Sequence, residues 1–300
     1  MKNNLIIIRY GEIALKGEVT RNRFEDTLVN NIINALKTKK ITCKIKKERG
    51  RIFLITDQIK DSINVLQKIF GIKSISPTLK TNSDIEDMSK FAIKLVKEHN
   101  LTKNNSFALR VTRTGGHSYS SQDVAIKIGN DIVKETKAKV NLTNPEHELF
   151  IEIRNKDAYF YTEKINCIGG MPLNTQGKVI SYIDSVYSIL ASWYIMRRGC
   201  SVIFLYSDDS FKKEINKFLS YWIIQNKKMI FTEKGKNLAD ILNKTCEQKN
   251  CEAIVTGYSI EDISIIKKLK KQCNYPILHP LIAMEKKEIK NECKKIGLKT

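Results

Sequence analysis

Residues 107–164 read FALRVTRTGGHSYSSQDVAIKIGNDIVKETKAKVNLTNPEHELFIEIRNKDAYFYTEK, a stretch in which the hydrophobic period changes several times. Alternating apolar residues indicate strands, whereas Val124, Ile128 and Ile132 recur every four positions and indicate one face of a helix. The polar SSQD segment that precedes them is typical of a helix N-terminus. The stretch therefore predicts a strand, a helix and a closing hairpin, at residues 107–112, from 120 onward, and at 149–153 with 158–163.

Upstream of this stretch, Ser83 followed by Glu86 predicts the capped start of a helix that runs to Glu98. With this helix, the second unit of the chain covers residues 81–171. Residues 1–80 show the order strand, helix, strand, strand, helix, strand, at 5–9, 24–36, 41–45, 51–56, 59–70 and 72–79. A split β-α-β pattern of this size predicts a ferredoxin-like domain.

From residue 172 the pattern changes to an alternation of apolar strands and helices. Strands are expected at 179–183, 202–206, 228–231 and 253–256, and helices between them, for example at 186–198 and 237–250. This alternation is typical of a doubly wound parallel α/β domain. The predicted fold class is therefore α+β followed by α/β, in three domains that cover residues 1–80, 81–171 and 172–300.

The chain carries 52 basic and 32 acidic residues, a formal net charge of +20. Such an excess favours a polyanionic partner, because each neutralised phosphate releases counterions. Lysine, isoleucine and asparagine are abundant throughout, however, so a generally lysine-rich surface explains the charge equally well. No apolar run is long enough to span a bilayer and no signal-peptide pattern opens the sequence, so we expect a cytoplasmic protein without a membrane contact.

Seven cysteines are scattered along the chain without a Cys-x-x-Cys pair, and the two nearest in sequence are Cys246 and Cys251. Disulfide frameworks and zinc sites require closer, paired spacing. We therefore expect most of these cysteines to be reduced core residues. No metal site and no catalytic cysteine is predicted.

Several short segments resemble one known family. They read RYGEIALKG, RVTRTGGH, VNLTNP, GGMP and TQGKV, at residues 9–17, 110–117, 140–145, 169–172 and 175–179. Together they resemble tRNA 4-thiouridine synthetases, also called tRNA sulfurtransferases. The resemblance is weak between 200 and 250 and returns in AIVTG and HPLIAM, at 253–257 and 279–284. It implies a ferredoxin-like N-terminal domain, a THUMP RNA-binding domain and a PP-loop ATP pyrophosphatase-like domain.

The second unit carries most of the residues that we expect to bind RNA. Arg110 and Arg113 lie near the end of the predicted strand, before a turn through Gly115 whose backbone N–H groups suit phosphate oxygens. His117 can stack on an unpaired base. The residues alone favour solvated loop positions at 113 and 117, and the resemblance reverses this preference. The predicted RNA-binding set is completed by Thr114, Lys16 and Lys164.

The resemblance also places an ATP-binding loop, of the form Ser-Gly-Gly-x-Asp-Ser, after the first strand of the α/β domain. The residues in that position are Ile183, Asp184, Ser185, Val186, Tyr187 and Ser188. Asp184 and Ser185 replace the glycines, and Tyr187 replaces the acidic residue. Side chains at glycine positions keep the backbone away from phosphates, and a carboxylate repels them. We therefore expect only very weak ATP binding at this loop and at Gly257.

Two other family segments also differ, since Thr-Gly-Glu-Ser-x-Gly-Gln reads TGYSIED at 256–262 and a Cys-x-x-Cys stretch is replaced by Gly235-Lys236-Asn237. We therefore expect a tRNA-binding protein that contacts the acceptor end, without catalytic residues or a cofactor of its own. The resemblance implies a homodimer, and a second protein would supply catalysis. The alternative is an active ATP-dependent tRNA sulfurtransferase that makes 4-thiouridine with ATP and Mg. A thiamine-pathway sulfur carrier fits less well, because no reactive-cysteine context is visible.

Overall fold

The computed structural model describes residues 4–225, 228–233 and 237–299. Contacts divide the chain into two compact units. Unit 1 contains Met1–Arg9, Thr42–Ile63 and Ser74–Asn166, and unit 2 contains Tyr10–Ile41, Asn64–Lys73 and Cys167–Thr300. Each unit is therefore assembled from segments that are distant in sequence.

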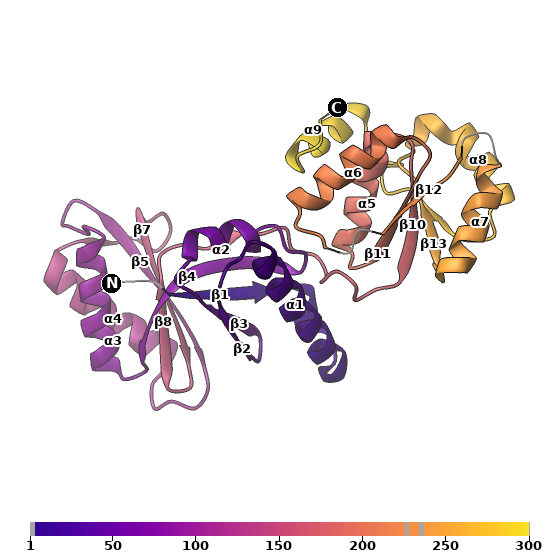
Figure 1. The fold of residues 1–300 in the computed structure, drawn as a ribbon. Helices are drawn as coiled ribbons and strands as arrows, with labels where there is room; N and C mark the ends of the chain where they lie inside the picture. Colours follow the sequence, from indigo (N-terminus) through magenta and orange to yellow (C-terminus); the bar gives the residue numbers. More distant parts are fainter. Residues whose placement is uncertain (1–3, 226–227, 234–236, 300) are drawn as a thin grey trace. The chain divides into compact units, whose positions relative to one another are not determined.

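Unit 1 is built on a sheet whose described strands follow the order β2-β3-β1-β4-β8-β7-β5-β6, with β9 paired to β4 (Figure 1). These strands are β1 (Leu5–Tyr10), β2 (Lys44–Glu48), β3 (Arg51–Ile55), β4 (Ile72–Asn82), β5 (Ser106–Thr114), β6 (Lys139–Val140), β7 (His147–Arg154), β8 (Asp157–Tyr161) and β9 (Ile165–Asn166). β5 and β7 run parallel, whereas β7 and β8 form an antiparallel hairpin. The long strand β4 connects the N-terminal half of the sheet to the half that carries β5, β7 and β8.

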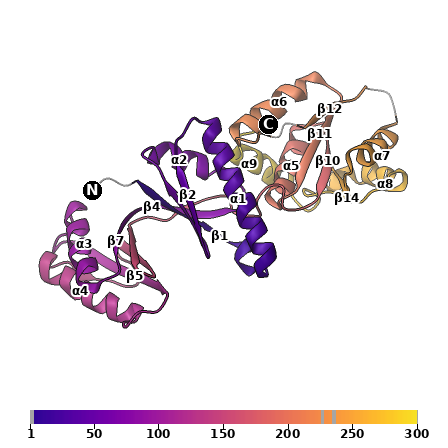
Figure 2. The same ribbon diagram turned by 60° about the horizontal axis from the view of Figure 1, so that its bottom comes forward.

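Two helices of unit 1, α3 (Ile85–Glu98) and α4 (Ser121–Thr136), lie side by side on one face of the sheet (Figures 1 and 2). Asp84 caps α3, because its side chain accepts hydrogen bonds from two backbone N–H groups of the first turn. Ser120 and Asp123 form a capping box at the start of α4. The apolar faces of both helices share a core with β5, β7 and β8. On the opposite face of these strands, Phe150, Tyr159 and Tyr161 are also buried, in a second cluster with Leu5, Ile7 and Phe53.

Unit 2 contains a parallel sheet whose described strands follow the order β12-β11-β10-β13-β14. They are β10 (Lys178–Ile183), β11 (Ser201–Tyr206), β12 (Met229–Phe231), β13 (Ala253–Val255) and β14 (Ile277–Leu278). The chain moves outward from β10 to β12 and then returns to the other side of β10 for β13. Doubly wound folds bind ligands at such a switch point, next to the carboxyl ends of the two central strands.

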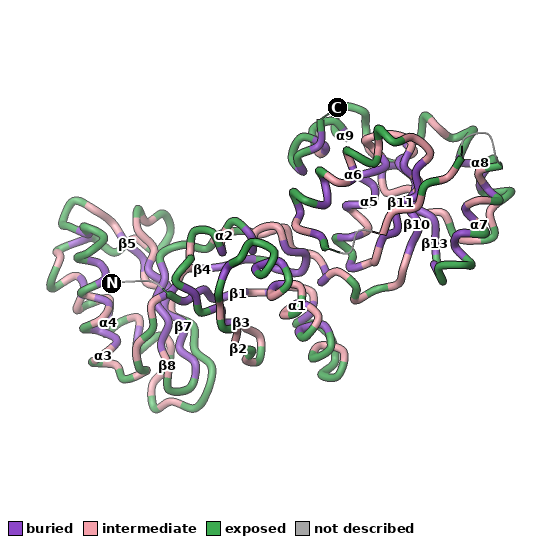
Figure 3. The backbone as a smooth tube through the Cα atoms, viewed as in Figure 1, coloured by how far each residue is buried: buried purple, intermediate pink, exposed green. Residues whose placement is uncertain are grey.

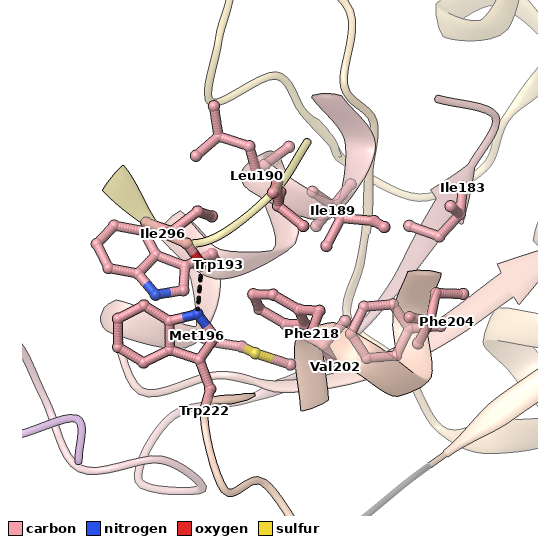
Figure 4. Packing of buried hydrophobic residues seen from close by; sticks show 14 of the residues in the cluster. Ile183, Ile189, Leu190, Trp193, Met196, Val202, Phe204, Phe218, Trp222 and Ile296 are labelled. Carbon is pink, nitrogen blue, oxygen red and sulfur yellow. Dashed lines mark hydrogen bonds between the residues drawn. The ribbon is translucent and has the colours of Figure 1, made fainter. Parts of the chain in front are cut away.

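Helices cover both faces of this parallel sheet (Figure 2). One face carries α5 (Val186–Arg197), α6 (Asp209–Tyr221) and α9 (Lys286–Lys295), and the other carries α7 (Leu238–Lys249) and α8 (Ile263–Gln272). In the core around α5, the Trp222 indole N–H donates to the carbonyl oxygen of Ile296 at 3.2 Å (Figure 4). Figure 3 shows that the strands are largely buried and that the outer faces of the helices are exposed.

The remaining described helices are η1 (Glu12–Leu15), α1 (Glu18–Thr38), α2 (Ile59–Leu66) and η2 (Ile260–Asp262). α1 buries Phe24, Leu28 and Ile32 on one face, as their four-residue spacing predicts. Within the part of the chain that the structure describes, no helix combines the length and the apolarity that a bilayer crossing requires.

The predicted fold class is confirmed, since a mixed α+β sheet precedes a parallel α/β sheet. Three local predictions are wrong. The cap of α3 is Asp84, and the Ser83 hydroxyl donates instead to the carbonyl oxygen of Asn155. The strand expected at 41–45 is β2, which begins at Lys44, because Ile41 is buried and its N–H still bonds to the end of α1.

The third wrong prediction is the helix at 59–70, since α2 ends at Leu66 and a turn leads to Gly71, whose φ is +99°. The elements β14, α8 and α9 were not predicted from the sequence pattern. Gly235 and Lys236, which stand in place of the Cys-x-x-Cys stretch, lie outside the described residues. The domain boundaries at 80 and 171 stay predictions.

Candidate nucleic-acid interface and nucleotide loop

The face of unit 1 that points away from α3 and α4 carries alternate residues of β5, β7 and β8. The strand register places Arg110 beside Phe150, and Phe150 beside Tyr161. Because successive side chains of a strand point to opposite faces, every second residue shares this face. The next two rows on it are Thr112 with Glu152 and Thr114 with Arg154.

A groove of about 440 Å³ lies at β5, between the first of these rows and the start of α4. Its basic and aromatic lining residues are Arg110, Lys164, Phe150 and Tyr161, and its polar ones include Thr112, Ser121 and Gln122. Arg110 is fixed at the edge, because its Nε donates to Glu148 at 2.9 Å and its Nη2 donates to the carbonyl oxygen of Leu142 at 2.8 Å. Two residues of the predicted RNA-binding set therefore meet in one groove.

The aromatic rings of this groove are stacked beneath its lysine. The rings of Phe150 and Tyr161 are 5.1 Å apart and nearly parallel, and Lys164 Nζ lies 4.0 Å from the centroid of Phe150. Partial burial lowers the pKa of Lys164, and the neighbouring Arg9 lowers it further. Both rings are buried, and a cation covers each of them, Lys164 over Phe150 and Arg9 over Tyr161. The groove therefore presents positive charge, which suits the phosphates of a nucleic-acid strand.

The end of β5 and the turn that follows it carry four more of the predicted residues. The exposed Arg113 donates to the carbonyl oxygen of Gly115 at 3.0 Å. His117 has both ring nitrogens in contact, Nδ1 with Arg113 at 3.3 Å and Nε2 with the carbonyl oxygen of Asn155 at 2.6 Å. Gly115 has a φ of +111°, and a Cβ there would lie 2.7 Å from Asn155 Oδ1, so the packed turn requires glycine. Thr114, the last residue of β5, is exposed.

The predicted RNA-binding residues thus form two groups in unit 1, Arg110 with Lys164 and the turn from Arg113 to His117. Lys16 is exposed after η1 and belongs to unit 2. The roles of all seven in RNA binding stay predictions. Sequence reasoning missed Phe150 and Tyr161, although their alternation within the strand patterns places them on the face opposite the helices.

The predicted nucleotide loop lies at the carboxyl end of β10, where α5 begins. Ile183 is the buried last residue of β10, and Ser185 is the extended N-cap residue of α5. Between them, the Asp184 carboxylate accepts a hydrogen bond from the Ser188 hydroxyl at 2.7 Å and another from Tyr258. A carboxylate next to a helix N-terminus interacts favourably with the helix dipole. The protein thus supplies its own anion where such a helix would otherwise hold a phosphate.

The segment after β13 closes over the same helix start. A Cβ on Gly257 would lie 2.4 Å from the backbone nitrogen of Ser188, so the two segments are in close backbone contact. Burial raises the pKa of Tyr258, and Asp184 raises it further, so the hydroxyl remains a donor to that carboxylate. Tyr187, which stands at the family's acidic position, packs half-buried against the core. These residues do not fit a triphosphate, because the backbone approach is closed and a carboxylate fills the loop.

Two further polar groups of unit 2 directly follow β13 and β14. Thr256 Oγ1 lies 2.7 Å from His279 Nδ1, and burial lowers the pKa of His279. The seven cysteines form no disulfide in the structure, and burial raises the pKa of Cys167 and of Cys246 to about 12, which favours their protonated form. No group of three or more described His, Cys, Asp and Glu side chains could hold a metal ion.

Three family models match this chain. The ThiI ferredoxin-like domain matches residues 5–76, the THUMP domain matches 82–163, and the thiamine biosynthesis protein (ThiI) model matches 210–300. A probable tRNA sulfurtransferase from Methanobrevibacter smithii is 33% identical over 337 residues, which cover 99% of this chain and 87% of the relative. The chain belongs to the tRNA sulfurtransferase family. The resemblance found in the sequence motifs is therefore confirmed.

Further members of the tRNA sulfurtransferase family show the same extent of similarity. A probable tRNA sulfurtransferase from Saccharolobus solfataricus is 35% identical over 328 residues, covering 98% of this chain and 86% of its own. A solved protein from Pyrococcus horikoshii has a TM-score of 0.84 at 30% identity, over 98% of this chain and 100% of its own. A 4-thiouridine synthetase solved as an RNA complex with bound ATP has a TM-score of 0.82 at 23% identity. The match covers 98% of this chain and 84% of that protein, which shows that the two share the fold.

The three family models leave one long interval of this chain unmatched. Residues 164–209 lie between the THUMP match and the α/β match, and this interval contains the loop at 183–188. The alignment to the Methanobrevibacter relative is longer than this chain of 300 residues, so the relative contains residues that this chain lacks. The divergent loop thus lies in the region that the family models leave unmatched.

Proposed function

We propose that this tRNA sulfurtransferase-family protein binds the acceptor end of tRNA through the groove of Arg110 and Lys164. The observation that carries the proposal is the meeting of these two cations in one groove, above the buried and stacked rings of Phe150 and Tyr161. Sequence-specific and end-specific RNA recognition uses unpaired bases, which stack on aromatic or guanidinium planes while the phosphates meet basic groups. A single-stranded tRNA end offers both.

Family membership supports tRNA as the partner. The similar proteins from Methanobrevibacter and Saccharolobus are named probable tRNA sulfurtransferases, and the similar 4-thiouridine synthetase was solved with RNA. The THUMP match covers the β5, β7 and β8 strands that form the groove. We further propose that the protein acts as a cytoplasmic homodimer, which follows from the family resemblance and from the location of tRNA.

The second part of the proposal concerns the α/β domain. Asp184 occupies the helix start that a phosphate would need, and Gly257 lies against the backbone of Ser188. An additional carboxylate repels a triphosphate, and the closed backbone offers it few N–H donors. The domain therefore binds ATP poorly by itself, and a second protein supplies any activation of the tRNA.

The alternative function is ATP-dependent synthesis of 4-thiouridine in tRNA by this chain alone, with ATP and Mg. The observation that favours it is the extent of the family similarity, which reaches 98–99% of this chain and includes the α/β domain. Calorimetric titration with magnesium-ATP separates the two candidates. We expect a dissociation constant in the millimolar range, because a loss of several kcal/mol moves a micromolar site there. A micromolar constant, or thiolation of tRNA by the purified chain, would establish the alternative.

The RNA groove is tested by filter binding with tRNA. Replacing Arg110 and Lys164 together by alanine should weaken binding by about 2–4 kcal/mol, taking about 1–2 kcal/mol for each charged contact. The matched control replaces Lys90 and Lys94, two exposed lysines of α3 on the helical side of unit 1, and removes the same charge. Equal affinities for the two double variants would show that the groove is not the binding site.

A further inference from the structure

A second groove, of about 510 Å³, lies at the other end of the same sheet face. The β2–β3 hairpin and the ends of β5 and β7 line it, through Glu48, Arg49, Gly50, Arg51, Thr114, Arg154 and Asn155. Thr114 belongs to the predicted RNA-binding turn, and Asn155 is the residue against which that turn packs. The second groove thus adjoins the turn from Arg113 to His117.

The hairpin that lines this groove is held in place. Glu48 pairs with Arg51, so Arg49 and Gly50 form a two-residue turn, and the φ of +80° at Gly50 suits such a turn. The guanidinium of Arg154 donates to the carbonyl oxygen of Arg49 and thereby ties the turn to the end of β7. The Arg49 side chain remains exposed, and it makes no hydrogen bond or ion pair with any described residue.

Positive charge exceeds negative charge around the groove. The buried carboxylate of Glu152 is surrounded by three guanidinium groups, at 3.5 Å from Arg9, 2.7 Å from Arg51 and 3.2 Å from Arg154. The carboxylate that lines the groove, that of Glu48, is neutralised by Lys46 at 2.8 Å and by Arg154 at 3.6 Å. No carboxylate of a described residue balances the charge of Arg49. The carboxylate of Glu152 is shared by Arg51, Arg9 and Arg154, so it balances the charge of Arg51 only in part.

The two grooves are spaced for one strand of nucleic acid. From Arg110 to Thr114, β5 advances by four residue steps, which span roughly 13 Å at about 3.3 Å per step. Thr112, between them, is exposed and neutral, while the carboxylate of Glu152 in the same row is buried beneath its arginines. A backbone that follows β5 therefore meets basic groups at both ends and no free carboxylate between them.

We infer that the second groove is a phosphate-binding subsite for the RNA strand whose end occupies the first groove. Arg49 and Arg51 provide guanidinium donors, and the Thr114 hydroxyl provides a neutral one. The inference rests on the proposed function, which it extends from the THUMP strands to the hairpin of the ferredoxin-like strands. Such contacts set the position and direction of the strand without reading its sequence.

The experiment measures tRNA affinity at several salt concentrations for the full chain and for three variants. Arg49→Ala should bind about five- to tenfold more weakly at low salt, and the slope of log affinity against log salt should fall by roughly 0.7–0.9, the value for one lost phosphate contact. Arg49→Lys should restore the slope. Lys94→Ala, which removes one charge from the helical side, should leave affinity and slope unchanged.

Equal behaviour of Arg49→Ala and Lys94→Ala would overturn the subsite, and so would weaker binding without a change of slope. If the Arg110 and Lys164 variant is impaired in the same assay, the proposed function stands while the subsite falls. If that variant also binds like the parent, the groove of the proposed function falls, and the subsite falls with it. Arg49 has an exposed side chain without partners, so its truncation does not threaten the fold.

Discussion

Replacing Glu152 by glutamine should destabilise unit 1 more than any surface substitution. The Glu152 side chain is 4% exposed, and its carboxylate lies within 3.5 Å of the guanidinium groups of Arg9, Arg51 and Arg154. Glutamine keeps the shape but removes the charge that neutralises them. Breaking a buried ion pair costs about 3–5 kcal/mol, and the guanidinium groups of Arg9 and Arg154, at 11% and 9% exposure, stay largely buried when the carboxylate is removed. For a unit of this size that loss lowers the unfolding temperature by roughly 10–20 °C.

Circular dichroism and tryptophan fluorescence can follow this loss separately. Both tryptophans of the chain, Trp193 and Trp222, lie in the core of unit 2, so their fluorescence reports on that unit. We expect a lower transition in circular dichroism and an unchanged one in fluorescence. The control is Glu148→Gln, whose carboxylate pairs with Arg110 at 39% exposure and should contribute less than about 1 kcal/mol. A Glu152→Gln protein as stable as this control would refute the reasoning.

Two further predictions concern the α/β domain. Changing residues 183–188 to Ser-Gly-Gly-Val-Asp-Ser removes the Asp184 carboxylate from the helix start. Calorimetry should then detect stronger binding of magnesium-ATP. Unchanged binding would mean that the contact of Gly257 with Ser188 alone closes the site. Burial lowers the pKa of His279 below its usual 6.5, so at acidic pH the unfolded chain binds a proton at this histidine more readily than the folded chain does. The free energy of unfolding should therefore decrease as the pH falls below about 6.5. Tryptophan-detected unfolding between pH 7.5 and 5.5 should show this loss in the parent and a smaller one in His279→Gln.

The sequence was sufficient for the fold because its periodicities are strong. Val124, Ile128 and Ile132 lie in the core at the spacing that predicted a helix, and β10 to β13 lie within a few residues of their predicted positions. Short elements were missed for a physical reason. β14 has only two residues, and α9 has only two buried residues among many lysines, so neither gives a clear periodic signal.

The candidate site could be predicted only where its residues are close in sequence. The turn from Arg113 to His117 is a local motif, and it forms one group in the structure. Arg110 and Lys164 are far apart in sequence, and only the pairing of β5, β7 and β8 brings them to one groove. Arg49 and Arg154 were not predicted, because their meeting depends on the order of strands in the sheet and not on any local pattern.

The loop after β10 explains how the α/β domain keeps its fold with an altered phosphate cradle. A glycine-rich loop leaves backbone N–H groups that a phosphate satisfies, so its polar groups are incomplete without the ligand. In this chain the Asp184 carboxylate accepts from Ser188 and Tyr258, and the buried Ser192 hydroxyl donates to Ser181, 2.7 Å away. The polar side chains of the loop and of the adjoining parts of β10 and α5 therefore pair with one another. We therefore propose that this domain folds without ATP and that the basic grooves of unit 1 carry the interaction with RNA.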